Sequence, residues 1–250
     1  MRVGVEGHEV RQELGAGDRV GVRPVGDAEE DDRPRPVSTI GILGAGRVGT
    51  ALARQALRAG YRVLVAASGE PAAIGLIVEV MASGAVAVHA ADAARQADVV
   101  VLSVPLRKYA TLDPAALAGK VVVDAMNYWP ETDGPLPDLE AAPSSSEMVQ
   151  AFLPGARVVK TLNHIGYHEL ETHGAPAGAP GRRALAVAGD DEGARAVVGD
   201  LVEKLGYDAV DAGPLAAGAA LEPGTEIFAG RHDRPALERL LALAAAPATA

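Results

Sequence analysis

Short apolar runs and longer amphipathic stretches alternate along this chain from about residue 38 onwards. Runs such as Thr39–Leu43 and Asp98–Val104 are almost continuously apolar, which is typical of strands in a parallel sheet covered on both faces. The stretches between them have helical periodicity, as in Glu192–Leu205, where apolar residues recur at intervals of three and four. Strands that alternate with helices predict a doubly wound α/β sheet with right-handed crossovers.

The pattern places the elements as follows. The expected strands are Thr39–Leu43, Tyr61–Ala66, Ala85–Val88, Asp98–Val104, Lys120–Asp124, Arg157–Leu162, Ala184–Ala188 and Tyr207–Asp211. The expected helices are about Val48–Ala59, Pro71–Ser83, Asp92–Gln96, Ser146–Phe152, Glu192–Leu205 and Arg234–Ala246.

The first expected strand runs into Gly44-Ala45-Gly46-Arg47-Val48-Gly49, a G-x-G-x-x-G pattern that opens an Ala/Leu helix. The first glycine permits a tight turn, the second lets the backbone approach phosphates, and the third lets the helix pack closely on its strand. The helix N-terminus points N–H groups at the anion. Because a strand precedes the pattern and a helix follows it, the sequence predicts a dinucleotide site in a Rossmann-type fold.

Three parts are therefore expected in the chain. Residues 1–37, with the block Glu29-Glu30-Asp31-Asp32, predict a flexible acidic leader, because so few apolar residues cannot offset the entropy of ordering. The alternative is upstream sequence that the working protein does not need. Residues 38–165 predict the dinucleotide-binding domain, and residues 166–250 a small C-terminal α/β cap.

Composition narrows the function. A net charge of -10 argues against nucleic-acid binding, and the absence of cysteine excludes disulfides and thiolate metal sites. No apolar run reaches the roughly 20 residues that span a bilayer, and the N-terminus lacks a signal-peptide pattern. We expect a soluble cytoplasmic protein, with small-molecule cofactors as partners, neither nucleic acid nor membrane, and a homodimeric assembly.

The second expected strand ends Val65-Ala66-Ala67-Ser68-Gly69, with no acid before Glu70. A carboxylate at this place would bind a ribose hydroxyl and repel a phosphate, whereas a small hydroxyl accepts a phosphate. Ser68 is therefore the candidate for the adenosine phosphate of NADP, with Arg47 as a charge partner. The alternative is that Ser68 only forms a turn, and NAD stays open as the nucleotide.

Ligands of open parallel sheets lie at the carboxyl ends of the strands. Three segments are expected there, containing Ser103-Val104-Pro105, Asn127, and Asn163-His164-Ile165. Val104 and Pro105 offer an apolar floor and the two asparagines offer amides. For Ser103 and Val104 the alternative is ordinary strand packing.

His164, His168 and His173 share a polar stretch with Glu169 and Glu171, but the spacing of metal ligands is absent. We expect no metal there and interpret the stretch as a solvated loop or the rim of a second site. The chain also lacks the G-x-S-x-G turn of Ser-His-Asp hydrolases.

Several segments, in this order, resemble the F420-dependent NADP oxidoreductases. They are the Gly44–Gly49 loop, Ser103-Val104-Pro105, Asp124-Ala125-Met126-Asn127-Tyr128, Val159-Lys160-Thr161-Leu162-Asn163-His164-Ile165, Ala186-Val187-Ala188-Gly189-Asp190-Asp191 and Asp211-Ala212-Gly213-Pro214-Leu215. The resemblance covers about Ser38 to Gly230.

The resemblance implies a hydride passed between NADPH and a deazaflavin, coenzyme F420, as co-substrate. Asn163, His164 and Ile165 would then line the junction of the two rings, and Ala67–Ser68 would face the NADP phosphate. No catalytic acid or base is assigned. Gly69 departs from the family, where an arginine commonly follows the serine, and the leader has no counterpart.

Two other functions stay open at this point. One is an NADPH-dependent imine or keto-acid reductase, although such enzymes usually carry a long all-helical C-terminal domain and this chain predicts strands there. The other is a non-catalytic dinucleotide-binding sensor, because a reductase of this type needs no diagnostic catalytic side chain.

Overall fold

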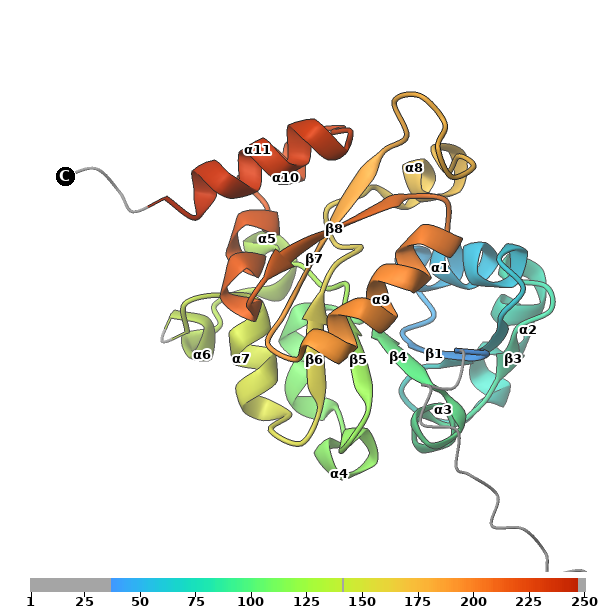
Figure 1. Cartoon of the computed structure of the whole chain (residues 1–250). Coiled ribbons are helices and arrows are strands. Elements are labelled where there is room, and N and C mark those ends of the chain that lie inside the picture. Colours follow the sequence, from blue (N-terminus) through green and yellow to red (C-terminus); the bar gives the residue numbers. More distant parts are fainter. Residues whose placement is uncertain (1–36, 141, 247–250) are drawn as a thin grey trace, which may run out of the picture. The chain divides into compact units, whose positions relative to one another are not determined.

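The computed structural model describes residues 37–140 and 142–246, so the predicted leader lies outside the described residues except for Val37. The described residues form an eight-stranded sheet in the order β3-β2-β1-β4-β5-β6-β7-β8 (Figure 1). The strands are β1 (Thr39–Leu43), β2 (Arg62–Ala66), β3 (Val86–Ala87), β4 (Val99–Leu102), β5 (Val121–Asp124), β6 (Arg157–Lys160), β7 (Ala184–Gly189) and β8 (Asp208–Gly213).

Helices and two 3-10 segments connect the strands. They are α1 (Arg47–Arg58), α2 (Ala72–Met81), α3 (Ala90–Gln96), η1 (Leu106–Thr111), α4 (Pro114–Leu117), α5 (Pro130–Asp133), α6 (Pro137–Glu140), α7 (Ser145–Phe152), α8 (Tyr167–Thr172), α9 (Glu192–Lys204), η2 (Leu215–Leu221), α10 (Glu226–Ala229) and α11 (Arg234–Ala244).

The strand pairing confirms the Rossmann-type α/β class. β1 pairs in parallel with both β2 and β4, so the chain reverses its direction of travel across the sheet at β1. In open α/β sheets ligands bind at such a switch point, outside the carboxyl ends of the strands. β7 pairs antiparallel with β6, and with β8 it continues the same sheet. The division into domains at residues 165 and 166, which falls between β6 and α8, stays a prediction.

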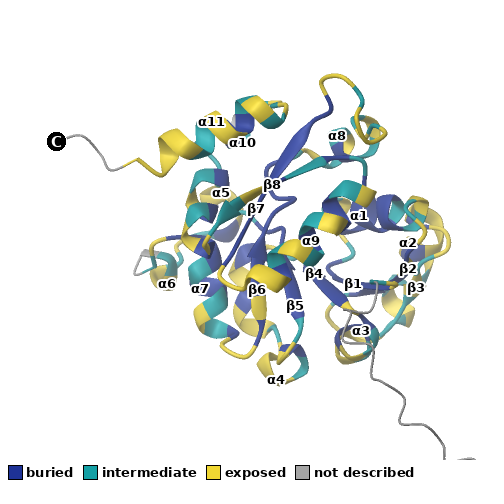
Figure 2. Cartoon of the chain, viewed as in Figure 1, coloured by how far each residue is buried: buried dark blue, intermediate teal, exposed yellow. Residues whose placement is uncertain are grey.

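The sheet is buried on both faces, as its apolar strands predict. Val99 and Val101 of β4 belong to a cluster with residues of α1 and α9, whereas Val100 and Leu102 belong to a cluster with residues of α3 and α7. Successive side chains of a strand point to opposite faces, so an unbroken apolar strand fills two cores. Figure 2 shows the strands mostly buried and the exposure concentrated on the outer sides of helices and loops.

One predicted feature is wrong. The polar stretch from His164 to His173 is not a solvated loop, because it contains α8, and Leu170 of this helix is 2% exposed in the core beside α1. Glu171 accepts hydrogen bonds from the Arg54 guanidinium of α1, which lowers the pKa of the Glu171 carboxyl. The polar side chains of this stretch thus join two helices.

Helix α2, next to the edge strand β3, is apolar on its outer side. Leu76, Ile77, Val80 and Met81 are all exposed there, and Val78 is buried. The expected homodimer stays a prediction. Within residues 37–140 and 142–246, no helix combines the length and the apolar character that crossing a bilayer requires.

Candidate nucleotide-binding site

Backbone contacts shape the glycine turn between β1 and α1. Gly44 has a φ of +129°, where L side chains are disfavoured, and a Cβ there would lie 2.5 Å from the Ser103 carbonyl oxygen. A Cβ at Gly49 would lie 1.8 Å from the Gly44 carbonyl oxygen. At Gly46 no atom lies within 4 Å of the Cβ position, so this part of the turn is open. The geometry is the one that the motif predicts; phosphate binding by these glycines stays a prediction.

Helix α1 begins directly after the turn, and no side chain caps its N-terminus. Gly46 is the N-cap residue, and the first turn contains no acidic residue. The Thr50 N–H donates to the Gly46 carbonyl at 2.9 Å, whereas in the described structure the N–H groups of Arg47, Val48 and Gly49 have no acceptor. Three free amides at the positive end of a helix dipole favour an anion at this place.

A cavity of about 340 Å³ opens beside the turn, a size suited to part of a small-molecule ligand. Its walls are the glycine turn, the end of β2, α3, and the stretch from Ser103 to α4. The lining residues are Leu43, Gly44, Ala45, Gly46, Ala66, Ala67, Ser68, Ala90, Ala91, Ala94, Ser103, Val104, Pro105, Lys108, Thr111, Leu112, Asp113, Ala116 and Leu117.

This cavity brings together only some of the predicted site residues. It is lined by Gly44, Ala45, Gly46, Ala67, Ser68, Ser103, Val104 and Pro105. Its lining does not include Arg47, Val48, Gly49, Asn127, Asn163, His164 or Ile165. The cavity therefore joins the ends of β1, β2 and β4, and the asparagines that follow β5 and β6 lie outside it.

Ser68 is exposed where β2 ends, and the residues before it bear no carboxylate. Glu70 is largely exposed, and its carboxylate lies 3.7 Å from the imidazole of His89. Gly69 has a φ of +103°, so the arginine that the resemblance leads one to expect there would be strained. Arg47, the predicted charge partner of Ser68, is exposed at the start of α1 and does not line the cavity.

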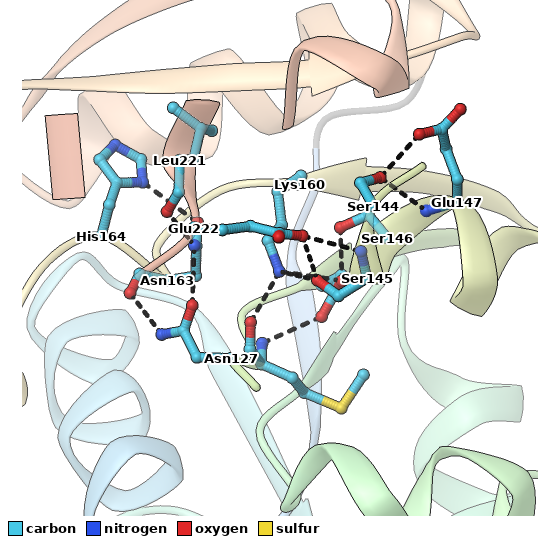
Figure 3. Close-up of polar contacts among 12 residues, drawn as sticks. Asn127, Ser144, Ser145, Ser146, Glu147, Lys160, Asn163, His164, Leu221 and Glu222 are labelled. Atoms are coloured by element: carbon cyan, nitrogen blue, oxygen red, sulfur yellow. Dashed lines mark hydrogen bonds and ion pairs between the residues drawn. The ribbon is translucent and has the colours of Figure 1, made fainter. Parts of the chain in front are cut away.

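Asn127 and Asn163 form a pair that joins the ends of β5 and β6 (Figure 3). The Asn163 amide nitrogen donates to Asn127 Oδ1 at 3.0 Å and to the Leu221 carbonyl at 2.7 Å. The Asn127 amide nitrogen donates to the Asn163 carbonyl at 2.8 Å. An asparagine has two N–H donors, so both donors of Asn163 are used and one of Asn127 is left over. Asn127 is half-buried and Asn163 is buried; that either of them contacts a ligand stays a prediction.

His164 is fully buried and links β7 to this pair. Its Nε2 accepts a hydrogen bond from the Ala186 N–H at 3.1 Å, so Nδ1 carries the proton and donates to Asn163 Oδ1, also at 3.1 Å. Burial and the nearby Arg183 guanidinium lower the pKa of His164 to about 3. The ring is neutral at physiological pH and both of its nitrogens are used. That His164 lines a ring junction stays a prediction.

The backbone is irregular just before Asn163. Leu162 has a φ of +61°, which is unusual for a residue with a side chain. The Thr161 hydroxyl is buried without a hydrogen-bond partner in the described structure. Strained and unsatisfied groups cluster at functional sites more often than elsewhere. Leu162 directly precedes Asn163, so this irregular backbone leads into the asparagine pair.

Sequence reasoning missed a buried ion pair between Lys160 and Asp124, both of which are 0% exposed. The Lys160 ammonium lies 3.2 Å from Asp124 Oδ2 and donates to the Met126 carbonyl at 2.6 Å. The Ser146 hydroxyl also donates to Asp124, at 2.7 Å. The pair fixes the backbone that leads to Asn127. A charged residue at the last position of each of two neighbouring apolar strands, in register with one another, was the available signal.

Known proteins share this architecture. A family model described as NADP oxidoreductase, coenzyme F420-dependent, matches residues 39–128, from β1 to the segment after β5. A hypothetical protein from Sinorhizobium meliloti of known structure is 32% identical, with a TM-score of 0.68 over 78% of this chain and 95% of that one. The chain belongs to the F420-dependent NADP oxidoreductase family. It is thus a member of an oxidoreductase family of NADP type.

Other structures are similar to this family member. A candidate F420-dependent NADP-reductase from Arthrobacter sp. FB24 is 26% identical, with a TM-score of 0.63 over 82% of this chain and 94% of that one. A variant of the imine reductase from Myxococcus stipitatus is 18% identical, with a TM-score of 0.53 over 74% of this chain and 57% of that one. At that identity the likeness shows the fold alone. A search of curated proteins finds no match.

Proposed function

We propose that this chain transfers a hydride between NADP(H) and a deazaflavin of the coenzyme F420 type. The observation that carries the proposal is the group of free amides at the start of α1, beside a cavity that continues to Ser68. The amides suit a pyrophosphate, and the end of β2 has no carboxylate to repel a phosphate on the ribose. Family membership supports the same nucleotide and the same class of acceptor.

In this arrangement the pyrophosphate would lie on the amides of Arg47, Val48 and Gly49, with the adenosine in the cavity. The nicotinamide would then extend toward Asn127, whose remaining N–H is available to a carboxamide. The nicotinamide and the deazaflavin supply the hydride chemistry themselves. The chain orients the two rings and keeps water away from them, which agrees with a neutral, fully bonded His164.

A turnover assay tests the acceptor. The purified protein is mixed with NADPH or NADH and oxidised coenzyme F420, and the loss of absorbance of both is followed. A parallel arm replaces F420 by a keto acid and an amine, and a third measures nucleotide binding alone. We expect oxidation of NADPH with F420 only. Turnover with the imine-forming pair instead would favour an imine reductase, and tight nucleotide binding without any turnover would favour a sensor.

A glycine variant tests the nucleotide site itself. A Gly46→Val side chain would meet no protein atom within 4 Å of its Cβ, so the protein should fold, yet the branched side chain would occupy the position of the pyrophosphate. We expect NADPH affinity to fall at least about 100-fold, because several charge-assisted hydrogen bonds are lost together. Gly75→Val, at an equally open glycine of α2, is the matched control and should bind normally. Normal NADPH affinity of Gly46→Val would show that the glycine turn is not the site.

A further inference from the structure

Two charged residues, Lys108 and Asp113, are among the described residues that line the cavity, and only one of them has hydrogen-bond partners for its side chain. The Asp113 carboxylate caps α4, where it accepts hydrogen bonds from the Ala115 and Ala116 N–H groups at 2.9 and 3.2 Å. The other charged residue is Lys108, whose ammonium has neither a hydrogen bond nor an ion pair among the described residues. Among the described lining residues, the cavity therefore has one lysine without a partner and one carboxylate that is held at the start of α4.

The hydroxyl groups that line the cavity also differ in whether they have a hydrogen-bond partner within the protein. The Ser103 hydroxyl donates to the carbonyls of Leu43 and Gly44, at 3.3 and 3.2 Å. The Thr111 hydroxyl donates to the carbonyl of Lys108 at 2.7 Å. Ser68 is left, since in the described structure its hydroxyl makes no hydrogen bond. Among the described lining residues, the polar side chains without a hydrogen bond are thus those of Ser68, at the end of β2, and Lys108, on η1.

The backbone of Lys108 is held firmly, although its side chain is free. Leu106 and Tyr109, on either side of it in η1, are 0% and 7% exposed. The Lys108 N–H donates to the Pro105 carbonyl at 2.9 Å. The long stem of Lys108 therefore starts from a fixed point, which limits the entropy lost when its ammonium is bound.

The distribution of charge in the site indicates which group of the nucleotide the Lys108 ammonium would bind. The pyrophosphate has its own partners in the amides of α1, so it does not need Lys108. A phosphomonoester adds a further charge of about -1.5 to -2 near pH 7. The remaining lining is largely apolar, with Ala90, Leu112 and Leu117 among its members, so it offers a phosphomonoester few other polar partners. Lys108 itself is exposed, so salt screens its charge.

We infer that Lys108 and Ser68 together bind the ribose phosphate of NADP(H), with Lys108 supplying the charge that selects NADP(H) over NAD(H). This inference rests on the proposed function. It also replaces the sequence-based expectation for Arg47. With a left-handed glycine after Ser68, the cation comes instead from η1, which is distant in the sequence and shares the cavity.

Calorimetric titration of four nucleotides tests the assignment. NADP⁺ and 2′,5′-ADP carry the ribose phosphate, whereas NAD⁺ and 5′-AMP lack it. The variants are Lys108→Met, which keeps the length without the charge, and Lys108→Arg, which keeps the charge. Arg107→Met is the matched control, because Arg107 is the neighbouring exposed cation and does not line the cavity.

We expect Lys108→Met to weaken NADP⁺ and 2′,5′-ADP at least about tenfold, and NAD⁺ and 5′-AMP less than about threefold, as loss of one charge-assisted contact predicts. Lys108→Arg should restore most of the preference, Arg107→Met should not alter it, and added salt should reduce it. Equal weakening of all four nucleotides, or none, would overturn the assignment of Lys108 and leave the nucleotide site intact. A wild-type protein that binds neither dinucleotide would instead overturn the proposed function.

Discussion

A methyl group at Gly49 should destabilise this protein more than its size suggests. The Cβ of Gly49→Ala would lie 1.8 Å from the Gly44 carbonyl oxygen and 2.7 Å from the Ser103 hydroxyl. The carbonyl cannot move away easily, because it accepts a hydrogen bond from Ser103, while the Gly44 N–H donates to the Ala66 carbonyl at 2.8 Å. Relief of the clash requires α1 to shift away from β1.

The magnitude follows from two opposing terms. Overpacking in a well-filled core costs about 1–3 kcal/mol, and contact with a fixed backbone atom at this distance belongs at or above the upper end. Alanine in place of glycine in a helix contributes up to about 1 kcal/mol of stability in return. The net loss for Gly49→Ala should be about 2 kcal/mol or more, which lowers the Tm of a domain of this size by roughly 4–8 °C.

Urea unfolding and calorimetry of the protein without nucleotide measure this loss. Gly75→Ala is the matched control, since Gly75 is also a helical glycine and no atom lies within 4 Å of its Cβ position. It should gain up to about 1 kcal/mol from helix propensity alone. If Gly49→Ala were as stable as Gly75→Ala, α1 could not pack against the glycine turn as described, and the geometry of the proposed phosphate site would be wrong.

Two further predictions concern the buried polar groups. Lys160→Met should reduce the free energy of unfolding by about 3–5 kcal/mol, because it leaves the Asp124 carboxylate buried without its cation. Urea unfolding measures this loss, and adding Asp124→Asn should recover part of it. A loss below about 1 kcal/mol would contradict the buried pair. The pKa of His164 in the folded protein is about 3, below its ordinary value of 6.5. Between these two pH values His164 binds a proton in the unfolded chain and not in the folded one. Its contribution to stability is complete above pH 6.5 and falls as the pH drops toward 3, by about 2 kcal/mol between pH 7 and 5. His164→Gln should lose that part of the pH dependence. Urea unfolding of both proteins at pH 7 and pH 5 gives the change in unfolding free energy between the two pH values. The same change in both proteins would refute the assignment.

Much of the fold was accessible from the sequence because most of the strands, such as β1, β4 and β5, are short and mainly apolar runs. β1, β4 and β5 lie where the pattern predicts, within a few residues at their ends. The helix α8 was missed because Glu169 and Glu171 look solvated, whereas each accepts hydrogen bonds from an arginine elsewhere in the chain, Arg183 and Arg54. Periodicity over six residues with one buried leucine is too weak a signal to show such a helix.

The glycine turn is a local feature, so the sequence by itself determined it: the strand, the three glycines and the helix follow one another without interruption. Contacts between distant segments were decided only by the tertiary structure. The sheet order brings Asp124 beside Lys160, η2 supplies the carbonyl that holds Asn163, and η1 carries Lys108 into the cavity of Ser68. Neither periodicity nor motif spacing records which strands become neighbours, and that neighbourhood decides which side chains pair with one another and which share a cavity.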